Sequence, residues 1–310
     1  MGRTLVKIGQ TDVETTALGL GANAVGGRNL FPNLKDETGI EIVQTALRSG
    51  INLIDTAYAY GLGHSEELIG QAIQNFDRHE ITIASKGAHD GDQFNNDPQF
   101  LTTQVENSLR RLKTDYLDIY YIHFPDEKTP KAEAVGALQR LKEQGKIRAI
   151  GVSNFSLDQI KEANADGYVD IVEDQFSLLH QDNLAKMTYL KDHQISFVPY
   201  FPLASGLLTG KYDGPVSFAD GDIRAKNPDF QAPRYDQILA AVKRVQPIAD
   251  LHQATVAQTI LAWYMQNPLI SIVIPGAKQP AQVQSNAAAL DVQLNDEEYA
   301  EIDRLFAAFK

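Results

Sequence analysis

The chain has 310 residues, of which 43% are hydrophobic; it has no cysteine and carries a formal net charge of −12. These values exclude a disulfide framework and a thiolate metal site, and they argue against nonspecific binding to nucleic acid. The sequence has no apolar run long enough to span a membrane and no signal-peptide core after Met1, so we expect a cytoplasmic protein.

The chain begins with a hairpin pattern and continues with alternating strands and helices. Residues 4–8 and 13–16 alternate in polarity around a turn, which predicts that they pair as a hairpin. Apolar runs that predict buried strands start near residues 17, 51, 81, 116, 147, 169, 195 and 271. Each run precedes a predicted helix, two of which have capping boxes at 156–159 and 295–298.

These eight strand–helix units predict a parallel sheet, because parallel strands need crossover connections and read as apolar runs. We therefore predict an α/β fold, a (β/α)8 TIM barrel with extra C-terminal helices, in a single domain over residues 1–310. A doubly wound open sheet is the alternative, and it would require a glycine-rich fingerprint after the first strand. The glycines at 19, 21, 26 and 27 do not have that spacing.

The stretch over residues 51–70 combines a buried strand, a loop rich in functional groups and a helix start. Its apolar run ends at Asp55, and a carboxylate at the end of a buried strand is costly unless a cation pairs with it. We therefore expect a cationic partner for Asp55. Ser65, followed by two glutamates, is typical of a serine N-cap, so we expect the helix to begin there.

Functional side chains follow three successive strands of the predicted barrel. Asp55 and Tyr60 follow the strand near 51, Lys86 follows the next, and His123 follows the strand near 116. Each alone has an ordinary structural explanation, as a helix cap, a packed tyrosine, a surface lysine or a core histidine. Because the C-terminal strand ends of a barrel surround one cavity, we expect the four side chains to converge there.

The chemistry of these four residues is complementary. Asp55 would keep Lys86 charged, and the ammonium would lower the pKa of Tyr60, which could then act as a general acid toward a carbonyl oxygen. His123 would hydrogen-bond the same oxygen. With no metal-binding cluster at the strand ends, this combination predicts proton delivery coupled to hydride from a bound cofactor.

These four residues match the tetrad of the aldo-keto reductases, within a segment that resembles the D-T-A-x-x-Y-G motif of that family. The resemblance covers nearly the whole chain and is strongest to the bacterial reductases that are similar to the inositol-operon reductase IolS and to potassium-channel β subunits. It implies a barrel plugged by the N-terminal hairpin and an NADP-dependent oxidoreductase that reduces aldehydes or ketones to alcohols. NADPH would bind in an extended pose without a Rossmann fold.

The resemblance also implies three groups of cofactor-binding residues. Ser153 and Asn154, with Gln175 as their partner, resemble the clamp on the nicotinamide amide. A segment that follows the strand near 195 resembles the loop that stacks on the nicotinamide and covers the pyrophosphate, through Tyr200, Phe201, Pro202, Leu203, Ser205, Gly206, Leu208 and Lys211. The site for the adenosine 2′-phosphate and adenine would be formed by Gly276, Lys278, Gln282 and Asn286. Gly21, Asn23 and Arg224 are further candidates, of which Arg224 could equally be a solvated loop charge.

Lys278 is the expected contact of the 2′-phosphate. NADPH should therefore be preferred over NADH, but not strictly, because lysine binds phosphate as a point charge. The expected partner is a small carbonyl compound, in a pocket walled by Phe31, Tyr58, Phe124 and Phe201; we expect no nucleic-acid or membrane partner, and a monomer. The alternative function is an NADP(H)-binding sensor with little turnover, and a metal-dependent hydrolase is disfavoured.

Overall fold

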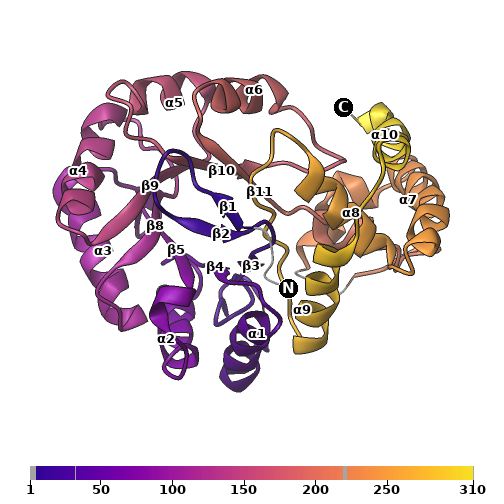
Figure 1. Ribbon diagram of the computed structural model, residues 1–310, viewed down its shortest axis with the longest axis horizontal. Coiled ribbons are helices and arrows are strands. Elements are labelled where there is room, and N and C mark those ends of the chain that lie inside the picture. The colour runs from indigo at the N-terminus through magenta and orange to yellow at the C-terminus, as the bar shows by residue number, and fades with distance from the viewer. Residues whose placement is uncertain (1–4, 32, 219–221, 310) are drawn as a thin grey trace.

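A computed structural model describes residues 5–31, 33–218 and 222–309. Within these ranges seven parallel strands form a sheet in the order β11-β10-β9-β8-β5-β4-β3, surrounded by helices (Figure 1). The strands are β3 (Leu20–Gly21), β4 (Leu53–Asp55), β5 (Thr82–Gly87), β8 (Leu117–Ile122), β9 (Ile147–Ser153), β10 (Ile171–Gln175) and β11 (Ser196–Tyr200). The predicted barrel is confirmed, because the last segment closes this sheet.

The closing segment forms isolated bridges rather than the full strand predicted near residue 271. Val273 donates to the carbonyl of Ala17 at 2.9 Å, and Gly19 donates to the carbonyl of Val273 at 2.9 Å. On the other side, Ser271 donates to the carbonyl of Phe197 at 2.9 Å. The segment therefore joins β3 to β11, the two edge strands of the sheet.

Helices alternate with these strands as predicted. Their bounds are α1 (Asp36–Arg48), α2 (His64–Ala72), α3 (Pro98–Leu112), α4 (Lys131–Glu143), α5 (Leu157–Ala163), α6 (Leu184–Asp192), α7 (Arg234–Leu251), α8 (Val256–Gln266), α9 (Pro280–Ala287) and α10 (Asp296–Leu305). The predicted capping boxes at the starts of α5 and α10 are both present. Figure 1 shows α1 to α6 around the strands, with α7 and α10 packed farther from the barrel. None of the helices in the described ranges is long and apolar enough to cross a membrane.

The barrel interior is filled by apolar side chains from successive strands, and the N-terminal hairpin closes its lower end. The interior cluster contains Leu53, Ala84, Ile119, Ala149, Ile171, Val198 and Ile272 together with Ile8 and Val13 of the hairpin. The hairpin pairs β1 (Leu5–Lys7) with β2 (Glu14–Thr16); residue 4 of the predicted hairpin lies outside the described ranges. Gly9 donates to Ser196 at the start of β11, so the plug lies at the N-terminal ends of the strands.

Three local features differ from expectation. Helix α2 begins at His64 after Gly63, which provides no side-chain cap, so the predicted Ser65 cap is wrong. Ser65 is instead buried; its hydroxyl accepts a hydrogen bond from the Thr56 hydroxyl at 2.8 Å and donates one to the carbonyl of Ala22 at 3.2 Å. A short hairpin, β6 (His89–Asp90) and β7 (Gln93–Phe94), follows β5. The long loop after β11 contains the 3-10 helices η2 (Ala204–Thr209), η3 (Ile223–Lys226) and η4 (Pro228–Phe230).

Candidate active site

The four expected tetrad residues meet at the C-terminal ends of three neighbouring strands. Asp55 is the last residue of β4, Lys86 lies near the end of β5, and His123 directly follows β8. Asp55 and Lys86 each lie two residues after an interior side chain, Leu53 or Ala84, so the alternation of a strand turns them into the barrel. Tyr60 enters from the loop between β4 and α2.

Lys86 is the centre of this arrangement. Its side chain is 0% exposed, and its ammonium donates to a carboxyl oxygen of Asp55 and to the carbonyl of Thr56 at 3.1 Å. The same nitrogen lies 5.4 Å from the ring centroid of Tyr60 and 5.6 Å from that of Tyr121. The expectation that a cation pairs with Asp55 is therefore confirmed.

A second buried carboxyl, which sequence reasoning missed, also faces this lysine. Glu173 of β10 is 2% exposed, and its Oε2 lies 3.3 Å from Nζ of Lys86. Burial alone would lower the pKa of Lys86, but the charges of Asp55 and Glu173 outweigh burial and raise the pKa above its ordinary value. Lys86 therefore remains charged. The signal available in the sequence was the alternation along residues 171–175, which places Glu173 on the interior face.

The expected lowering of the Tyr60 pKa is wrong. Burial is the largest influence and raises the pKa of Tyr60 well above its ordinary value, although the charge of Lys86 acts in the opposite direction. The charges of Asp55 and Glu173 raise the pKa further. Burial outweighs the effect of the ammonium, so the pocket as a whole raises the pKa of Tyr60. Tyr60 is therefore a neutral phenol that holds its proton, which is the form that a proton donor requires.

His123 lies in an aromatic environment that keeps it neutral. Its ring centroid lies 6.2 Å from that of Tyr60, 4.9 Å from that of His89 and 5.0 Å from that of Phe124. Burial first, and then the charge of Lys86, lower the pKa of His123 well below its ordinary value. A neutral imidazole can donate one hydrogen bond from one ring nitrogen and accept one at the other. Nδ1 of His123 has no hydrogen-bond partner within the described part of the chain.

The loop that carries Tyr60 is held by a buried ion pair that sequence reasoning also missed. Nε of Arg111, on α3, donates to Glu66 at 2.6 Å, and the hydroxyl of Ser85 donates to the other oxygen of Glu66 at 2.5 Å. The guanidinium of Arg111 lies 5.1 Å from the ring centroid of Tyr58. Any side chain at Gly63, where φ is +96°, would lie 2.7 Å from Nε of Arg111. These contacts fasten the loop to β5 next to Lys86.

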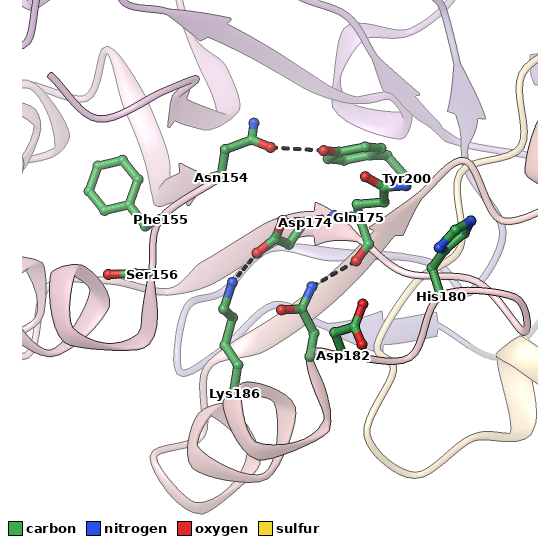
Figure 2. A pocket seen from close by; sticks show the side chains of 10 residues that line it. Asn154, Phe155, Ser156, Asp174, Gln175, His180, Asp182, Lys186 and Tyr200 are labelled. Carbon is green, nitrogen blue, oxygen red and sulfur yellow. Dashed lines mark hydrogen bonds and ion pairs between the residues drawn. The ribbon is translucent and has the colours of Figure 1, made fainter. Parts of the chain in front are cut away.

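A cavity of about 450 Å³ is lined by Asn154, Gln175 and Tyr200 among others, and by none of the four tetrad residues (Figure 2). Asn154, with φ of +62°, donates to the carbonyl of His123 and to the hydroxyl of Ser153, both at 3.0 Å. Tyr200 donates to Oδ1 of Asn154 at 2.8 Å (Figure 2). Gln175 lines the same cavity but is exposed, and its carbonyl accepts a hydrogen bond from Asn183 at 2.7 Å. Asp174 of the same strand points to Lys186 of α6 instead (Figure 2).

The loop after β11 is fixed in a strained conformation. Phe201 and Ser205 both have φ of +55°, and Phe201 is 49% exposed. The carbonyl of Pro202 accepts a hydrogen bond from Tyr264 at 2.8 Å, while the carbonyl of Leu203 accepts one from Gly206 at 2.8 Å. Leu208 is fully buried beneath the loop. Backbone strain held by surrounding contacts is typical of ligand-binding segments.

Lys211, Arg224 and Lys278 form a group of cations near this loop. Gly206 has φ of +94°, a conformation that favours glycine, and a Cβ there would lie 2.6 Å from Nζ of Lys211 and displace the end of the lysine side chain. Burial first, and then the charges of Arg224 and Lys211, lower the pKa of Lys278. Since the chain has a net charge of −12, three mutually repelling cations at one place indicate an anionic ligand.

Arg224 and Lys278 differ in how many of their hydrogen bonds are already made within the protein. Arg224 donates two hydrogen bonds to Asp222, at 2.9 Å and 2.6 Å, and one to the Tyr212 hydroxyl at 3.2 Å. Lys278 has its ammonium 4.2 Å from the ring centroid of Phe31. Phe31 therefore contacts a cofactor candidate. The charge of Lys278 is therefore more available to an anionic ligand than that of Arg224.

The remaining candidates lie around the last strand segment. Gly21 forms a bridge with Gly276, and Oδ1 of Asn23 would lie 3.2 Å from a Cβ at Gly276. The side chain of Gln282, on α9, accepts a hydrogen bond from the backbone of Lys278 at 2.7 Å. Asn286 is buried on the same helix. Within the described ranges no group of three or more His, Cys, Asp or Glu side chains could hold a metal ion.

Comparison with known proteins gives one consistent family. The model of the aldo/keto reductase family matches residues 17–307. The chain is 35% identical over 308 residues to the aldo-keto reductase YhdN of Bacillus subtilis, covering 96% of this chain and 92% of that one. It is 35% identical over 311 residues to the NADH-specific methylglyoxal reductase of Escherichia coli, covering 94% of each. A probable voltage-gated potassium channel subunit beta of Arabidopsis thaliana is 32% identical over 300 residues, covering 92% of this chain and 90% of that one.

Solved structures agree with this result. The glycerol dehydrogenase AKR11B4 from Gluconobacter oxydans superimposes with a TM-score of 0.90 at 31% identity, covering 99% of this chain and 96% of that one. An aldo-keto reductase from Klebsiella pneumoniae, solved in complex with NADPH, superimposes with a TM-score of 0.75 at 28% identity, covering 99% and 96%. The resemblance seen in the sequence is therefore confirmed for the family and for the fold.

Proposed function

The chain belongs to the aldo/keto reductase family, and from that premise we propose that it reduces aldehydes and ketones to alcohols with NADPH, using Tyr60 as the general acid. The observation that carries the proposal is the convergence of Asp55, Lys86, Tyr60 and His123 at the C-terminal ends of neighbouring strands, with Tyr60 protonated and Lys86 charged. When bound, the cofactor supplies the hydride that reaches the carbonyl carbon.

The residues of the chain supply the proton and the orientation. The neutral hydroxyl of Tyr60 donates its proton to the carbonyl oxygen as negative charge develops there. His123, also neutral, donates a hydrogen bond to the same oxygen and so fixes the position of the substrate. Lys86 lies 5.4 Å from the Tyr60 ring and stabilises the phenolate that remains. Asp55 holds Lys86 in place.

We assign the nicotinamide end of the cofactor to the cavity of Figure 2, where Asn154 links the lining to the tetrad through its hydrogen bond to the carbonyl of His123. Ser153 and Asn154 would bind the amide group, and Tyr200 would stack against the ring. The hydrogen bond from Tyr200 to Asn154 supports this assignment because it joins the two candidates across the cavity. Gln175 lines the same cavity with its side chain exposed, so it is available as the partner of Ser153 and Asn154 in binding the amide.

The group of cations supports a phosphorylated cofactor. The loop around Gly206 and Lys211 would bind the pyrophosphate, while Lys278, with Gln282 and Asn286, would bind the adenosine end. A methylglyoxal reductase relative is NADH-specific, whereas a Klebsiella relative was solved with NADPH, so the family itself does not decide the cofactor. We propose NADPH with weaker use of NADH, because Lys278 forms no ion pair within the described residues, whereas Arg224 is already paired with Asp222.

Aromatic rings pack on one side of His123, and we propose that they form a wall of the substrate site. Phe94 stacks on Phe124 with ring centroids 4.6 Å apart, and His89 lies 5.8 Å from Phe124. We propose that this wall favours carbonyl compounds with an apolar or aromatic substituent. Tyr58, also expected in this wall, has its ring centroid 5.1 Å from the guanidinium of Arg111.

An NADP(H)-binding sensor with little turnover is the second candidate function, and the potassium-channel relative favours it. The test is the oxidation of NADPH by the purified protein with a panel of aliphatic and aromatic aldehydes, beside a titration of cofactor fluorescence. Turnover with at least one aldehyde at a rate typical of enzymes supports the reductase. Tight cofactor binding with no turnover across the panel supports the sensor and contradicts the reductase.

A further inference from the structure

Glu173 is a buried carboxyl that the proposed reaction does not use. It lies on β10, in register with Ser153 of β9 and Val198 of β11, and two residues after the interior residue Ile171. The alternation of side chains along a strand therefore turns it into the barrel, where Lys86 is its ion-pair partner at 3.3 Å. Its Oε2 has no hydrogen-bond partner within the described ranges, although the atom is buried.

One ammonium faces two carboxyls in this pocket. Lys86 contacts Asp55 closely and Glu173 at a longer distance, and both carboxyl side chains are only 3% exposed. The other titratable groups that face Glu173 are Tyr60, Tyr121 and Tyr200, from the loop after β4, from β8 and from β11. Burial raises the pKa of all three, so they are neutral. If both carboxyls were ionised, one positive and two negative charges would leave a net charge of −1 in the barrel.

An uncompensated buried charge is strongly unfavourable, and two carboxyls that share a site titrate as a pair in which one retains its proton. Asp55 has the closer contact with Lys86 and is therefore the ionised member. Burial, and then the charge of Asp55, raise the pKa of Glu173 well above its ordinary value. Geometry and charge thus point to the same residue as the neutral member.

We propose that Asp55 and Glu173 together hold one proton at neutral pH, carried by Glu173, and that Glu173 stores this proton behind Lys86 and Tyr60. Glu173 acts through Lys86, so it is a positioning residue and a proton store that does not touch the substrate. The state of the proton is a property of the protein alone. Its use in turnover rests on the proposed carbonyl reduction.

During turnover, protons pass along Glu173, Lys86 and Tyr60 to the carbonyl oxygen. The O–H bond of Tyr60 breaks as the carbonyl oxygen takes the proton, which leaves a phenolate. A proton then moves from the Lys86 ammonium to the phenolate oxygen, and the proton of Glu173 moves to the Lys86 amine across the 3.3 Å separation. Tyr60 and Lys86 regain their starting states, and Glu173 becomes a carboxylate that takes a proton from water. No electrons are exchanged in this relay.

The direct test is infrared spectroscopy of the full chain without added cofactor, with isotope-labelled glutamate. We expect the carbonyl band of a neutral carboxyl at neutral pH, shifted by the label and absent from Glu173→Gln. The matched control is Glu66→Gln, which removes a buried glutamate whose two oxygens are bonded to Ser85 and Arg111 and should keep the band. A wild-type spectrum with carboxylate bands only would overturn the proposal, and labelled wild-type protein gives this answer even if a variant fails to fold.

Unfolding by urea gives a second readout with a definite sign. A carboxyl whose pKa is raised by folding contributes its full stability below its unfolded value of about 4.5, and loses it as pH rises through the folded value. Glu173→Gln removes this ionisation, so the stability of the variant relative to wild type should increase as pH rises above 4.5. A difference that does not change with pH would contradict the stored proton.

The role in turnover is tested by the pH dependence of aldehyde reduction. We expect the wild-type rate to fall at alkaline pH as the stored proton is lost, and Glu173→Gln to lack this ionisation. Glu173→Asp keeps a carboxyl at this position, so the fall in rate at alkaline pH should reappear with a shifted midpoint. The same ionisation in wild type and Glu173→Gln would overturn the relay. If no aldehyde is reduced, the proposed function fails, while the infrared and unfolding results still decide whether the proton is there.

Discussion

Lys86 of β5 and Asp55 of β4 form an ion pair from which solvent is almost completely excluded. The Lys86 side chain is 0% exposed and that of Asp55 is 3% exposed. Their strands are paired in register, with Asp55 opposite Ala84. Lys86 therefore lies two residues farther along β5 than the residue that faces Asp55. The pair is therefore fixed by the two strands of the barrel and does not depend on the mobility of a loop.

Replacement of Lys86 by Met should destabilise the protein by about 3–5 kcal/mol, because it leaves the buried Asp55 carboxylate without a counter-charge. The loss should be smaller at acid pH and grow as pH rises, since burial raises the pKa of Asp55 and of Glu173 and protonation removes the uncompensated charge. Urea unfolding at several pH values measures the effect.

The control for this variant is Lys146→Met, which removes a lysine from an exposed pair with Glu106. Those two side chains are 33% and 52% exposed, so solvent screens their attraction and the loss should be much smaller. Equal losses for the two lysine variants would mean that the Asp55–Lys86 pair contributes no more than a surface pair.

Gly151 should not tolerate a side chain. A Cβ at this position of β9 would overlap the ring of Tyr121, which lies 5.6 Å from the Lys86 ammonium. Gly151→Ala should therefore cost about 1–3 kcal/mol through overpacking and should also lower the rate of carbonyl reduction. Thermal unfolding and steady-state kinetics measure the two effects.

The matched substitution is Gly136→Ala in α4, where a Cβ would have no atom within 4 Å. This change should leave the rate unaltered and stabilise the helix by about 0.4–1 kcal/mol. A Gly151→Ala variant as stable and active as Gly136→Ala would show that the Tyr121 ring can move without consequence.

Lys278 should set the choice of cofactor. A charge-assisted contact with phosphate contributes roughly 1.5–3 kcal/mol, or one to two powers of ten in affinity. Lys278→Ala should weaken NADPH by about that factor and leave NADH nearly unchanged, whereas Lys278→Arg should retain the preference. Fluorescence titration with both cofactors measures this.

Two results would contradict the assignment of the 2′-phosphate to Lys278. Equal weakening of NADPH and NADH by Lys278→Ala would place the lysine near a part that both cofactors share. No weakening of either would direct attention to Arg224, which must then exchange its bonds with Asp222 for the phosphate.

The barrel could be predicted from the sequence because its strands are buried on both faces. Such strands read as apolar runs, and their spacing by helices leaves few architectures. The convergence of the tetrad could also be predicted, because the C-terminal strand ends of a barrel surround one site. Correct strand boundaries were enough to place Asp55, Lys86 and His123 there. The last segment was harder, since it closes the barrel through isolated bridges at residues 273 and 276.

Features of the site that depend on how separate segments approach one another could not be predicted from the sequence. Ser65 has the composition of a helix cap, but its hydroxyl bonds Thr56 and Ala22 across a tertiary contact. The sign of the Tyr60 pKa shift depends on burial and on Glu173, whose approach to Lys86 cannot be read along the chain. The pairing of Arg224 with Asp222 is local in sequence, yet only the structure separates it from a free phosphate-binding charge.

The central claim is that Tyr60 gives its proton to the carbonyl oxygen, and the most direct measurement compares Tyr60→Phe with wild type. The change removes one hydroxyl and keeps the ring against Lys86 and His123. Reduction of a good aldehyde substrate should fall by about 10²-fold or more, while NADPH affinity measured by fluorescence should stay nearly constant. Near-normal turnover by Tyr60→Phe would contradict the assignment of the proton donor and, with it, the proposed mechanism.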